Sequence, residues 1–236
     1  MALDKKTFRT RTLTAIVFAF VMLLGLFTNI WVFVGLFLVI MFGCLVEYVR
    51  LTKKINPHRH LGYLLFAIFY ILMPICMMID LGTGQTLISK ICGGESLLPI
   101  FYAPLLPSAI IFSIWINDTM AYIVGSMIGK TALSKISPKK TWEGTAGGAV
   151  LCVVVIAALG SLIPAAKNIA VYHWIAIASI CAVFGTLGDL LESKIKRMAN
   201  VKDSGSFMPG HGGFLDRFDS LLIDTPMVWL YVILFL

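Results

Sequence analysis

Long runs of apolar residues, separated by short polar segments, make up most of this chain. The runs cover about 13–28, 30–48, 61–79, 97–116, 145–164, 171–191 and 218–236. Each is close to the roughly 20 residues that one helical crossing of a bilayer requires. Because a helix satisfies its backbone hydrogen bonds internally, it suits a lipid environment. The pattern therefore predicts an all-α integral membrane protein, a polytopic bundle of about seven to eight transmembrane helices.

Two parts of this pattern need closer interpretation. The first run follows a basic head, as in a signal peptide, but no small-residue cleavage pattern follows and a second run begins at once. We therefore expect two helices joined by a tight turn at Thr28-Asn29. The segment 119–129 is also fairly apolar. Its length leaves open whether it forms a helix or a half-helix.

Composition excludes several classes of protein. Of the 236 residues, 59% are hydrophobic and 13% are charged, whereas an ordinary soluble domain has about 25% charged residues. A cytosolic enzyme, a secreted disulfide scaffold and a disordered chain are therefore excluded. The five cysteines are scattered and form no CxxC pair, so neither a zinc site nor a disulfide framework is indicated.

The basic residues predict the orientation in the membrane. With the N-terminus in the cytoplasm, 17 of the 19 Lys and Arg residues fall on the inner side, in segments 1–12, 49–60, 117–144 and 192–217. Only Lys90 and Lys167 fall outside. This bias is typical of the positive-inside rule and supports a cytoplasmic N-terminus.

The same pattern suggests how the chain is organised. We expect about three N-terminal transmembrane helices within 1–100 and a catalytic transmembrane domain within 101–236. The catalytic part would carry two cytoplasmic loops, 117–144 and 192–217, whose composition differs from that of a simple basic loop.

The first of these loops has the ingredients of an anion site. Its run Ser137-Pro138-Lys139-Lys140-Thr141 offers two ammonium groups and two hydroxyls ahead of a predicted helix, whose N-terminus can point at an anion. Gly125 and Gly129 are four residues apart, a spacing that lets another helix pack closely. Asp118 ends a long apolar run, where it is either a solvated helix terminus or a functional carboxylate.

The second loop lies in segment 185–224, which has the highest density of acidic residues and holds half of the 12 in the chain. These are Asp189, Glu192, Asp203, Asp216, Asp219 and Asp224. Hard divalent cations take carboxylate and phosphate oxygens, the interleaved Lys and Arg residues can hold phosphate, and glycines let backbone N–H groups approach an anion. The segment therefore indicates a metal–polyphosphate site. The alternative is a network of ion pairs on a solvated loop.

An ordered motif in these segments resembles a known family. It runs Ser193-x-Ile195-Lys196-Arg197, then Lys202-Asp203-x-Gly205, then Pro209-x-His211-Gly212-Gly213-Phe214-x-Asp216-Arg217-Phe218-Asp219. Together with Asp118, Gly125, Gly129-Lys130 and 137–141, it is similar to the bacterial phosphatidate cytidylyltransferases, or CDP-diacylglycerol synthases, over roughly 105–236. Met208 replaces the branched aliphatic residue or Phe usual before the proline. The chain is also shorter at its N-terminal side than many members.

The resemblance implies an activity and roles for residues. The family joins CTP to phosphatidic acid with Mg²⁺, giving CDP-diacylglycerol and pyrophosphate, and a second cation is left open. The implied metal ligands are Asp189 and Asp216, followed by Asp203, Asp219 and Asp118. The implied substrate-binding residues are Ser137, Lys139, Lys140, Thr141, Lys196, Arg197, Gly212 and Gly213. The implied catalytic residues are Asp189, Asp203, Asp216, Lys202, His211 and Arg217. For His211, bracing the glycine turn is the alternative role.

The expected surroundings follow from the same resemblance. The partners would be CTP, phosphatidic acid and the lipid bilayer, with a homodimer suggested by the family and no nucleic acid. The protein would lie in the bacterial cytoplasmic membrane with its site facing the cytoplasm. Two alternatives use CTP as well: a CTP-dependent lipid kinase, and a cytidylyltransferase for another lipid phosphate. A more distant alternative is a cation transporter, whose carboxylates should lie at mid-span.

Overall fold

The computed structural model describes residues 5–57, 60–83, 102–208 and 212–236, and within these residues the chain is helical, without a β-strand. The elements are α1 (Lys5–Phe27), α2 (Ile30–Ile55), α3 (His60–Ala67), a π-helical turn (Ile68–Leu72), α4 (Met73–Thr83), α6 (Leu105–Ile128), α7 (Trp142–Leu162), a 3₁₀ turn (Pro164–Ala166), α8 (Val171–Met198) and α9 (Leu215–Phe235). Six spans among the described residues are long and apolar enough to cross a membrane, and Thr12–Phe27 is a shorter apolar helix. The predicted all-α polytopic membrane protein is thereby confirmed.

Local sequence signals explain where α2 begins and how the next helix bends. Asn29 caps α2, because its side chain accepts a hydrogen bond of 3.0 Å from the backbone N–H of Val32. The tight turn predicted at Thr28-Asn29 is therefore present. Further along, the π-helical turn ends at Leu72, two residues before Pro74. Proline lacks an N–H and crowds the carbonyl four residues earlier, which accounts for a widened turn there.

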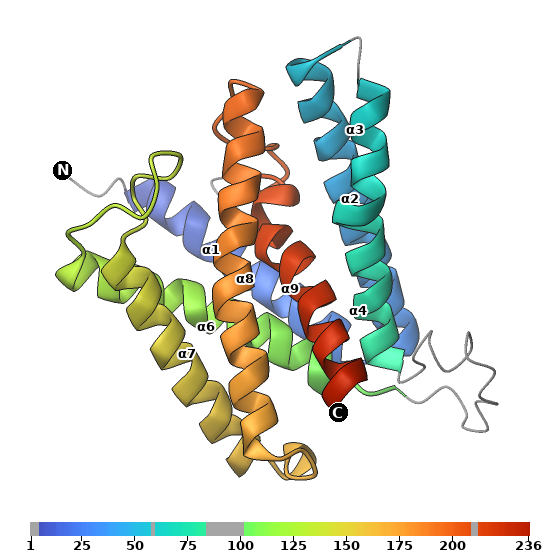
Figure 1. Ribbon diagram of the computed structural model, residues 1–236. Coiled ribbons are helices and arrows are strands. Elements are labelled where there is room, and N and C mark those ends of the chain that lie inside the picture. The colour runs from blue at the N-terminus through green and yellow to red at the C-terminus, as the bar shows by residue number, and fades with distance from the viewer. Residues whose placement is uncertain (1–4, 58–59, 84–101, 209–211) are drawn as a thin grey trace.

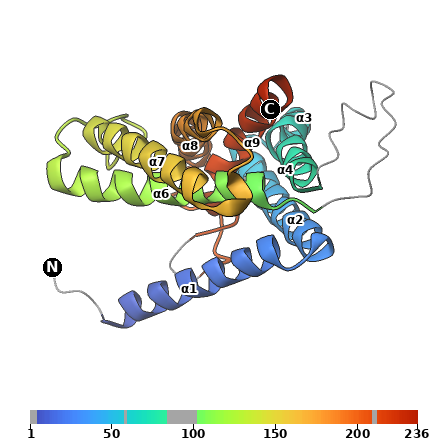
Figure 2. The ribbon, with the colours of Figure 1, turned by 90° about the horizontal axis from the view of Figure 1, so that it is seen from below.

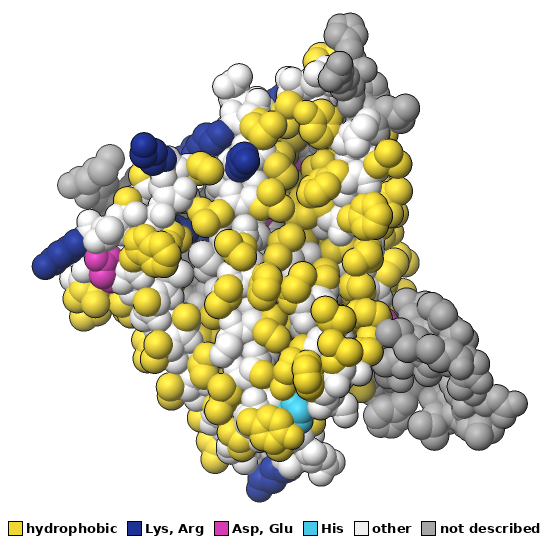
Figure 3. Space-filling view, viewed as in Figure 1, with side chains coloured by type: hydrophobic (Ala, Val, Ile, Leu, Met, Phe, Trp, Pro, Cys, Tyr) yellow, Lys and Arg dark blue, Asp and Glu magenta, His cyan; other side chains and the backbone are white. Residues whose placement is uncertain are grey.

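The helices form two flanks around a central pair (Figure 1). Helices α8 and α9 stand in the middle, α6 and α7 lie on one side, and α2 to α4 lie on the other. Seen from below, α1 runs along the edge of the bundle, apart from most of the other helices (Figure 2). In the space-filling view, hydrophobic side chains cover most of the visible face (Figure 3). Lys and Arg gather mainly at the end that carries the loop between α6 and α7.

Small residues let α6 and α7 approach closely. A Cβ atom at Gly148 would lie 2.7 Å from the backbone nitrogen of Ala121, and one at Gly144 would lie 2.7 Å from the carbonyl oxygen of Ala121. Gly125 lies at the same contact, because a Cβ atom at this position would lie 3.5 Å from the Cα of Gly144. Such small-residue seams are typical of helix pairs in membranes. The close packing predicted for Gly125 is therefore seen, and it fixes both ends of the loop that follows α6.

The boundaries of the two predicted loops differ from the structure. Helix α6 continues to Ile128, so the segment 119–129 is the end of one long helix rather than a separate half-helix, and 117–144 begins with helical turns. Likewise 192–198 is the end of α8, and 215–217 is the start of α9. Close packing of α6 on α7 stabilises the polar end of α6, an effect that a hydropathy pattern does not register.

Candidate functional site

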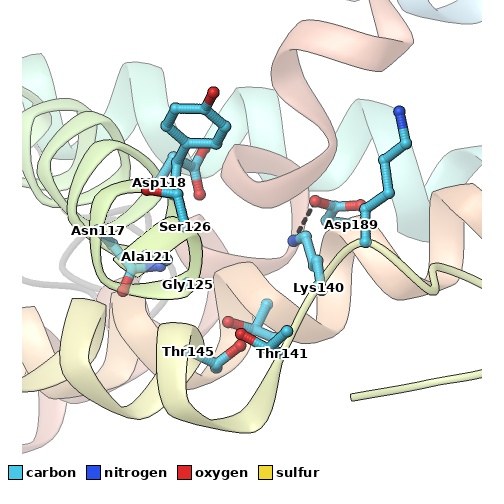
Figure 4. Close-up of a pocket in the computed structure, with 12 residues that line it drawn as sticks. Asn117, Asp118, Ala121, Gly125, Ser126, Lys140, Thr141, Thr145 and Asp189 are labelled. Carbon is cyan, nitrogen blue, oxygen red and sulfur yellow. Dashed lines mark ion pairs between the residues drawn. The ribbon is translucent and has the colours of Figure 1, made fainter. Parts of the chain in front are cut away.

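A pocket of about 380 Å³ opens between the second half of α6, the start of α7 and the C-terminal part of α8 (Figure 4). It is lined by Asn117, Asp118, Ala121, Tyr122, Gly125, Ser126, Lys139, Lys140, Thr141, Thr145, Thr186 and Asp189. Five of these are predicted site residues, and they come from both of the segments that the sequence singles out. The fold therefore joins the predicted anion site to two of the predicted carboxylates, Asp118 and Asp189.

An ion pair between the two segments crosses this pocket. The ammonium group of Lys140, on the loop before α7, pairs with the carboxylate of Asp189 on α8 (Figure 4). The carboxylate also accepts a hydrogen bond of 3.3 Å from the hydroxyl of Ser193, one turn later on α8. Lys140 and Asp189 are both partly exposed, with side-chain exposures of 29% and 28%. Each can therefore still meet a solute that enters the pocket.

The loop that presents Lys140 is held by its own backbone and by one carboxylate. Glu143, in the first turn of α7, accepts hydrogen bonds of 3.2 Å from the backbone N–H groups of Lys130 and Thr131. The N–H of Leu133 donates to the carbonyl of Lys140 at 2.7 Å. Glu143 is a site residue that the sequence analysis misses, although a carboxylate in the first turn of a helix is a recognisable signal. Its bonds fix the loop on which Lys139 and Lys140 lie.

Thr141 has two uses in this geometry. It is the N-cap of α7, where its hydroxyl oxygen accepts a hydrogen bond of 3.1 Å from the N–H of Gly144. A hydroxyl can accept and donate at the same time, so its proton remains available to an anion in the pocket. A helix N-terminus also carries a partial positive charge. The hydroxyl of Thr141 thus lies at the positive end of α7, and its role in binding phosphate stays a prediction.

Three carboxylates gather around the pocket. Asp118 and Asp189 line it, and Asp219 on α9 lies close enough for its charge to interact with both. Glycines bring these helices together: a Cβ at Gly188 would lie 2.6 Å from the carbonyl oxygen of Asp219. Like charges at short range are unfavourable unless cations join them. Lys140 provides one such positive charge, since it interacts with both Asp118 and Asp219.

A second cluster lies further along α8 and is centred on Asp216. Lys196 donates to Asp216 Oδ1 at 2.6 Å and also pairs with the buried Glu192. Asp216 Oδ2 accepts hydrogen bonds from the N–H and hydroxyl of Ser204, at 2.8 and 2.9 Å, and from the N–H of Gly213 at 2.8 Å. Charge-assisted bonds of this kind are the strong ones. Asp216 therefore organises the loop between α8 and α9.

Glu47 completes this cluster from a helix that the motif does not include. It is 5% exposed on α2, where its Oε2 accepts hydrogen bonds from the hydroxyl of Ser204, at 2.7 Å, and the N–H of Leu215, at 3.0 Å. A Cβ at Gly205 or Gly213 would collide with its carboxylate. The sequence analysis misses Glu47. The available signal is that it is the one charged residue in the apolar run 30–48.

The other predicted residues lie around these two clusters or away from them. Asp203 lines a separate pocket of about 430 Å³ with the basic residues Arg50, Lys53 and Lys54. Lys202 and Arg217 are exposed, and the guanidinium of Arg197 donates to the carbonyl of Val201 at 3.2 Å. The carbonyl of Ser137 closes a turn with the N–H of Lys140, and Gly212 has a φ of 85°, which suits glycine. His211 lies outside the described residues.

The carboxylates around the pocket suit a hard divalent cation. In the part of the chain that the structure describes, no three Asp, Glu, His or Cys side chains converge as ligands of a bound metal do. Mg²⁺, however, commonly takes one or two protein carboxylates and completes its shell with water and phosphate. One or two of the carboxylates of Asp118, Asp189 and Asp219 could supply such oxygen ligands. The oxygens of Asp216 are already hydrogen-bonded, and Asp203 is in a different pocket.

Comparison with known proteins places this geometry in a family. A family model described as the cytidylyltransferase family matches residues 96–235. The chain is 38% identical over 192 residues to a phosphatidate cytidylyltransferase of Bacillus subtilis (strain 168), covering 81% of this chain and 65% of that protein. It is 47% identical over 116 residues to the phosphatidate cytidylyltransferase of Staphylococcus saprophyticus, and 45% identical over 116 residues to that of Staphylococcus aureus (strain COL). Each of these two matches covers 49% of this chain and 44% of the relative.

The chain thus spans less than two thirds of the length of these curated relatives. The matched region contains α6 to α9, and therefore the pocket, the Lys140–Asp189 pair and Asp216. Glu47 precedes it. On the family model and the identities together, the chain belongs to the cytidylyltransferase family.

Proposed function

We propose that this chain is a CTP:phosphatidate cytidylyltransferase, which makes CDP-diacylglycerol and pyrophosphate from CTP and phosphatidic acid. The observation that carries the proposal is the pocket in which Lys139, Lys140 and Thr141 face Asp118 and Asp189. It offers cations, hydroxyls and a helix N-terminus to a polyphosphate, next to apolar spans that suit a lipid. The names of the relatives from Bacillus and Staphylococcus agree with this reaction.

The reaction requires that the two substrates are positioned and that their negative charges are neutralised. A phosphate oxygen of phosphatidate would attack the α-phosphorus of CTP and form a new P–O bond. The bond from the α-phosphorus to the bridging oxygen would break, and pyrophosphate would leave with that electron pair. The attacking oxygen is already ionised at neutral pH, so no strong general base is needed. Bringing two polyanions together in line is the main task, and fixed cations serve it.

The pocket with Lys140 and Asp189 and the cluster around Asp216 would each hold part of the substrates. Lys139, Lys140 and the Thr141 hydroxyl would hold the phosphates of CTP, since they lie on one loop at the start of α7. Lys196 and Arg217 would serve the phosphatidate head group or the leaving pyrophosphate. Mg²⁺, held by Asp189 together with Asp118 or Asp219, would neutralise additional phosphate charge. Asp216, also a predicted ligand, would first have to release its bond to Lys196.

The membrane side of the site is part of the proposal. The loop with Lys139 and Lys140 and the loop after α8 carry basic residues at the same end of the bundle (Figure 1). Basic loops face the cytoplasm in most membrane proteins. CTP is found there, so the pocket would open toward its substrate.

The direct test measures both products. Purified protein in detergent would receive phosphatidic acid, CTP labelled in its base and α-phosphate, and Mg²⁺. We expect CDP-diacylglycerol and pyrophosphate in equal amounts, with both lost when EDTA is added. Release of CDP together with a phosphorylated lipid would instead indicate the CTP-dependent lipid kinase. No product from protein that elutes as a single folded species would reject phosphatidate as the acceptor.

A further inference from the structure

An apolar groove lies between α1 and the rest of the bundle, outside the pocket described above. It has a volume of about 400 Å³, and its walls include Val17 and Val21 on α1, Val39 on α2, and Phe207 and Phe214 on the loop after α8. The lining is almost wholly apolar, with Thr14 as its polar residue. Figure 2 shows why a groove forms here: α1 runs apart from the central helices and meets the bundle mainly near α2. Phe18 closes one edge by packing on Phe218, with ring centroids 5.8 Å apart.

Arg217 connects this groove to the polar pocket. Arg217 lines a small neighbouring pocket with Met22 and Phe218, and these two residues also line the groove. The charge of Arg217 also interacts with Asp118, which lines the polar pocket beside Lys140. Arg217 therefore lies beside the apolar groove, and its charge reaches Asp118 in the wall of the polar pocket. This order of chemistry, from apolar to cationic, matches a lipid with an anionic head group.

We propose that this groove binds one acyl chain of the phosphatidate substrate, with the lipid phosphate at Arg217. The inference rests on the proposed function for the identity of the lipid. The groove residues recur at 13, 17 and 21 on α1, a distance of about 12 Å along a helix axis. That length accommodates a substantial part of one chain. The second chain would remain in the bilayer.

The shape of the groove, rather than its hydrophobicity, determines its contribution to lipid binding. An acyl chain that moves from the bilayer into the groove gains little transfer free energy, because lipid tails are as apolar as the side chains that line the groove. The groove would instead fix the lipid laterally, so that its phosphate stays near Arg217. Filling the groove should therefore impair use of the lipid and leave use of CTP unchanged.

Substitutions that fill the groove test this in the kinetics. Val39→Trp narrows the groove, and Val154→Trp on α7 is the matched control, because both valines are 59% exposed and Val154 lines none of these pockets. In mixed micelles we expect Val39→Trp to raise the apparent KM for long-chain phosphatidate about tenfold, with an unchanged KM for CTP. A short-chain phosphatidate should be affected far less. Equal lipid kinetics for the two variants would overturn the proposal.

A second measurement does not depend on turnover. Phosphatidate with a diazirine midway along one acyl chain would be photolysed with the full-length protein, and the labelled peptides identified by mass spectrometry. We expect saturable labelling of α1, α2 and the Phe207–Phe218 segment, weakened by Val39→Trp but not by Val154→Trp. Labelling there without any cytidylyl transfer would reject the proposed function and retain an anionic-lipid groove. Transfer with labelling elsewhere would reject the groove alone.

Two other occupants would also overturn the proposal. Equal labelling by a phosphatidylcholine with the same acyl probe would show that the groove holds an ordinary boundary lipid. The second alternative occupant is another copy of the protein. It would be indicated if the groove stayed unlabelled and the protein formed a dimer that Val39→Trp dissociates.

Discussion

Replacing Glu47 tests whether the N-terminal helices take part in catalysis. In Glu47→Ala, Ser204 loses one acceptor, and the N–H of Leu215 loses its partner at 3.0 Å in a buried environment. An orphaned buried donor costs about 1–3 kcal/mol, and a hydrogen bond to a charged group contributes about 1.5–3 kcal/mol. We therefore expect a loss of about 3 kcal/mol in unfolding free energy. In Glu47→Gln an amide oxygen still accepts one bond, so a smaller loss should follow.

The effect on catalysis should exceed the effect on stability. Ser204 joins Glu47 to Asp216, so Ser204 and the start of α9 should shift when the Glu47 carboxylate is removed. A misplacement of about 1 Å can cost about a hundredfold in rate, and we expect Glu47→Ala to lower kcat by between about tenfold and a hundredfold. Glu47→Gln should recover much of it. Initial rates at saturating CTP and phosphatidate, normalised to monodisperse protein, would measure this.

Asp80 provides the matched control for Glu47. Asp80 is 6% exposed and lies in the N-terminal half of the chain, and its carboxylate accepts a hydrogen bond of 2.7 Å from the indole N–H of Trp229 on α9. This bond also links the two halves of the chain, but Asp80 lines none of the polar pockets. Asp80→Ala should lower the thermal stability in detergent and leave kcat near the wild-type value. The reasoning would be refuted if Glu47→Ala behaved in the same way as Asp80→Ala.

Three further substitutions test the pocket and the helix seam. Lys140→Ala should raise the apparent KM for CTP about tenfold, equivalent to about 1.4 kcal/mol, and change the KM for phosphatidate little; equal changes in both would reject its assignment to CTP. Asp189→Asn should lower kcat at least about a hundredfold while expression stays intact, and near-normal turnover would remove Asp189 from the site. Gly148→Ala should lower both the thermal midpoint and activity, because its Cβ would lie 2.7 Å from the α6 backbone. Gly35→Ala, with nothing within 4 Å of the new Cβ, should change neither; equal thermal shifts would show that the seam is not tight.

The sequence predicts the helices well because membrane spans depend on local composition. A run of about 20 apolar residues has few alternatives in lipid. Most of the described helices follow the predicted runs, although α6 extends beyond its run to Ile128. The place of α1 at the edge of the bundle is not predictable in this way. Its apolar residues satisfy the requirement for a membrane helix whether they face lipid or protein. The number of membrane crossings and their orientation stay predictions.

The structure brings some of the predicted site residues together and adds contacts that the sequence analysis misses, while the chemical roles of these residues stay predictions. Lys140, Thr141 and Asp189 share one pocket, as an anion site beside a carboxylate requires. Asp203 lies in a different pocket, because the loop after α8 turns it toward the basic end of α2. Glu47 was missed because its bond to Ser204 joins residues that are 157 positions apart. No spacing rule for helices or turns reaches that far, so a contact of this kind needs the folded chain.

The seam between α6 and α7 determines which parts of the pocket can be varied. Gly125, Gly144 and Gly148 bring the two helices so close that a larger side chain at Gly144 or Gly148 would collide with α6. The wall formed by the α7 N-terminus is thus fixed in width, and small changes there should abolish binding rather than adjust it. The opposite rim carries Tyr122 and Ser126, which are exposed and line the same pocket. An effort to alter the nucleotide preference that we propose for this pocket would therefore start with these two side chains.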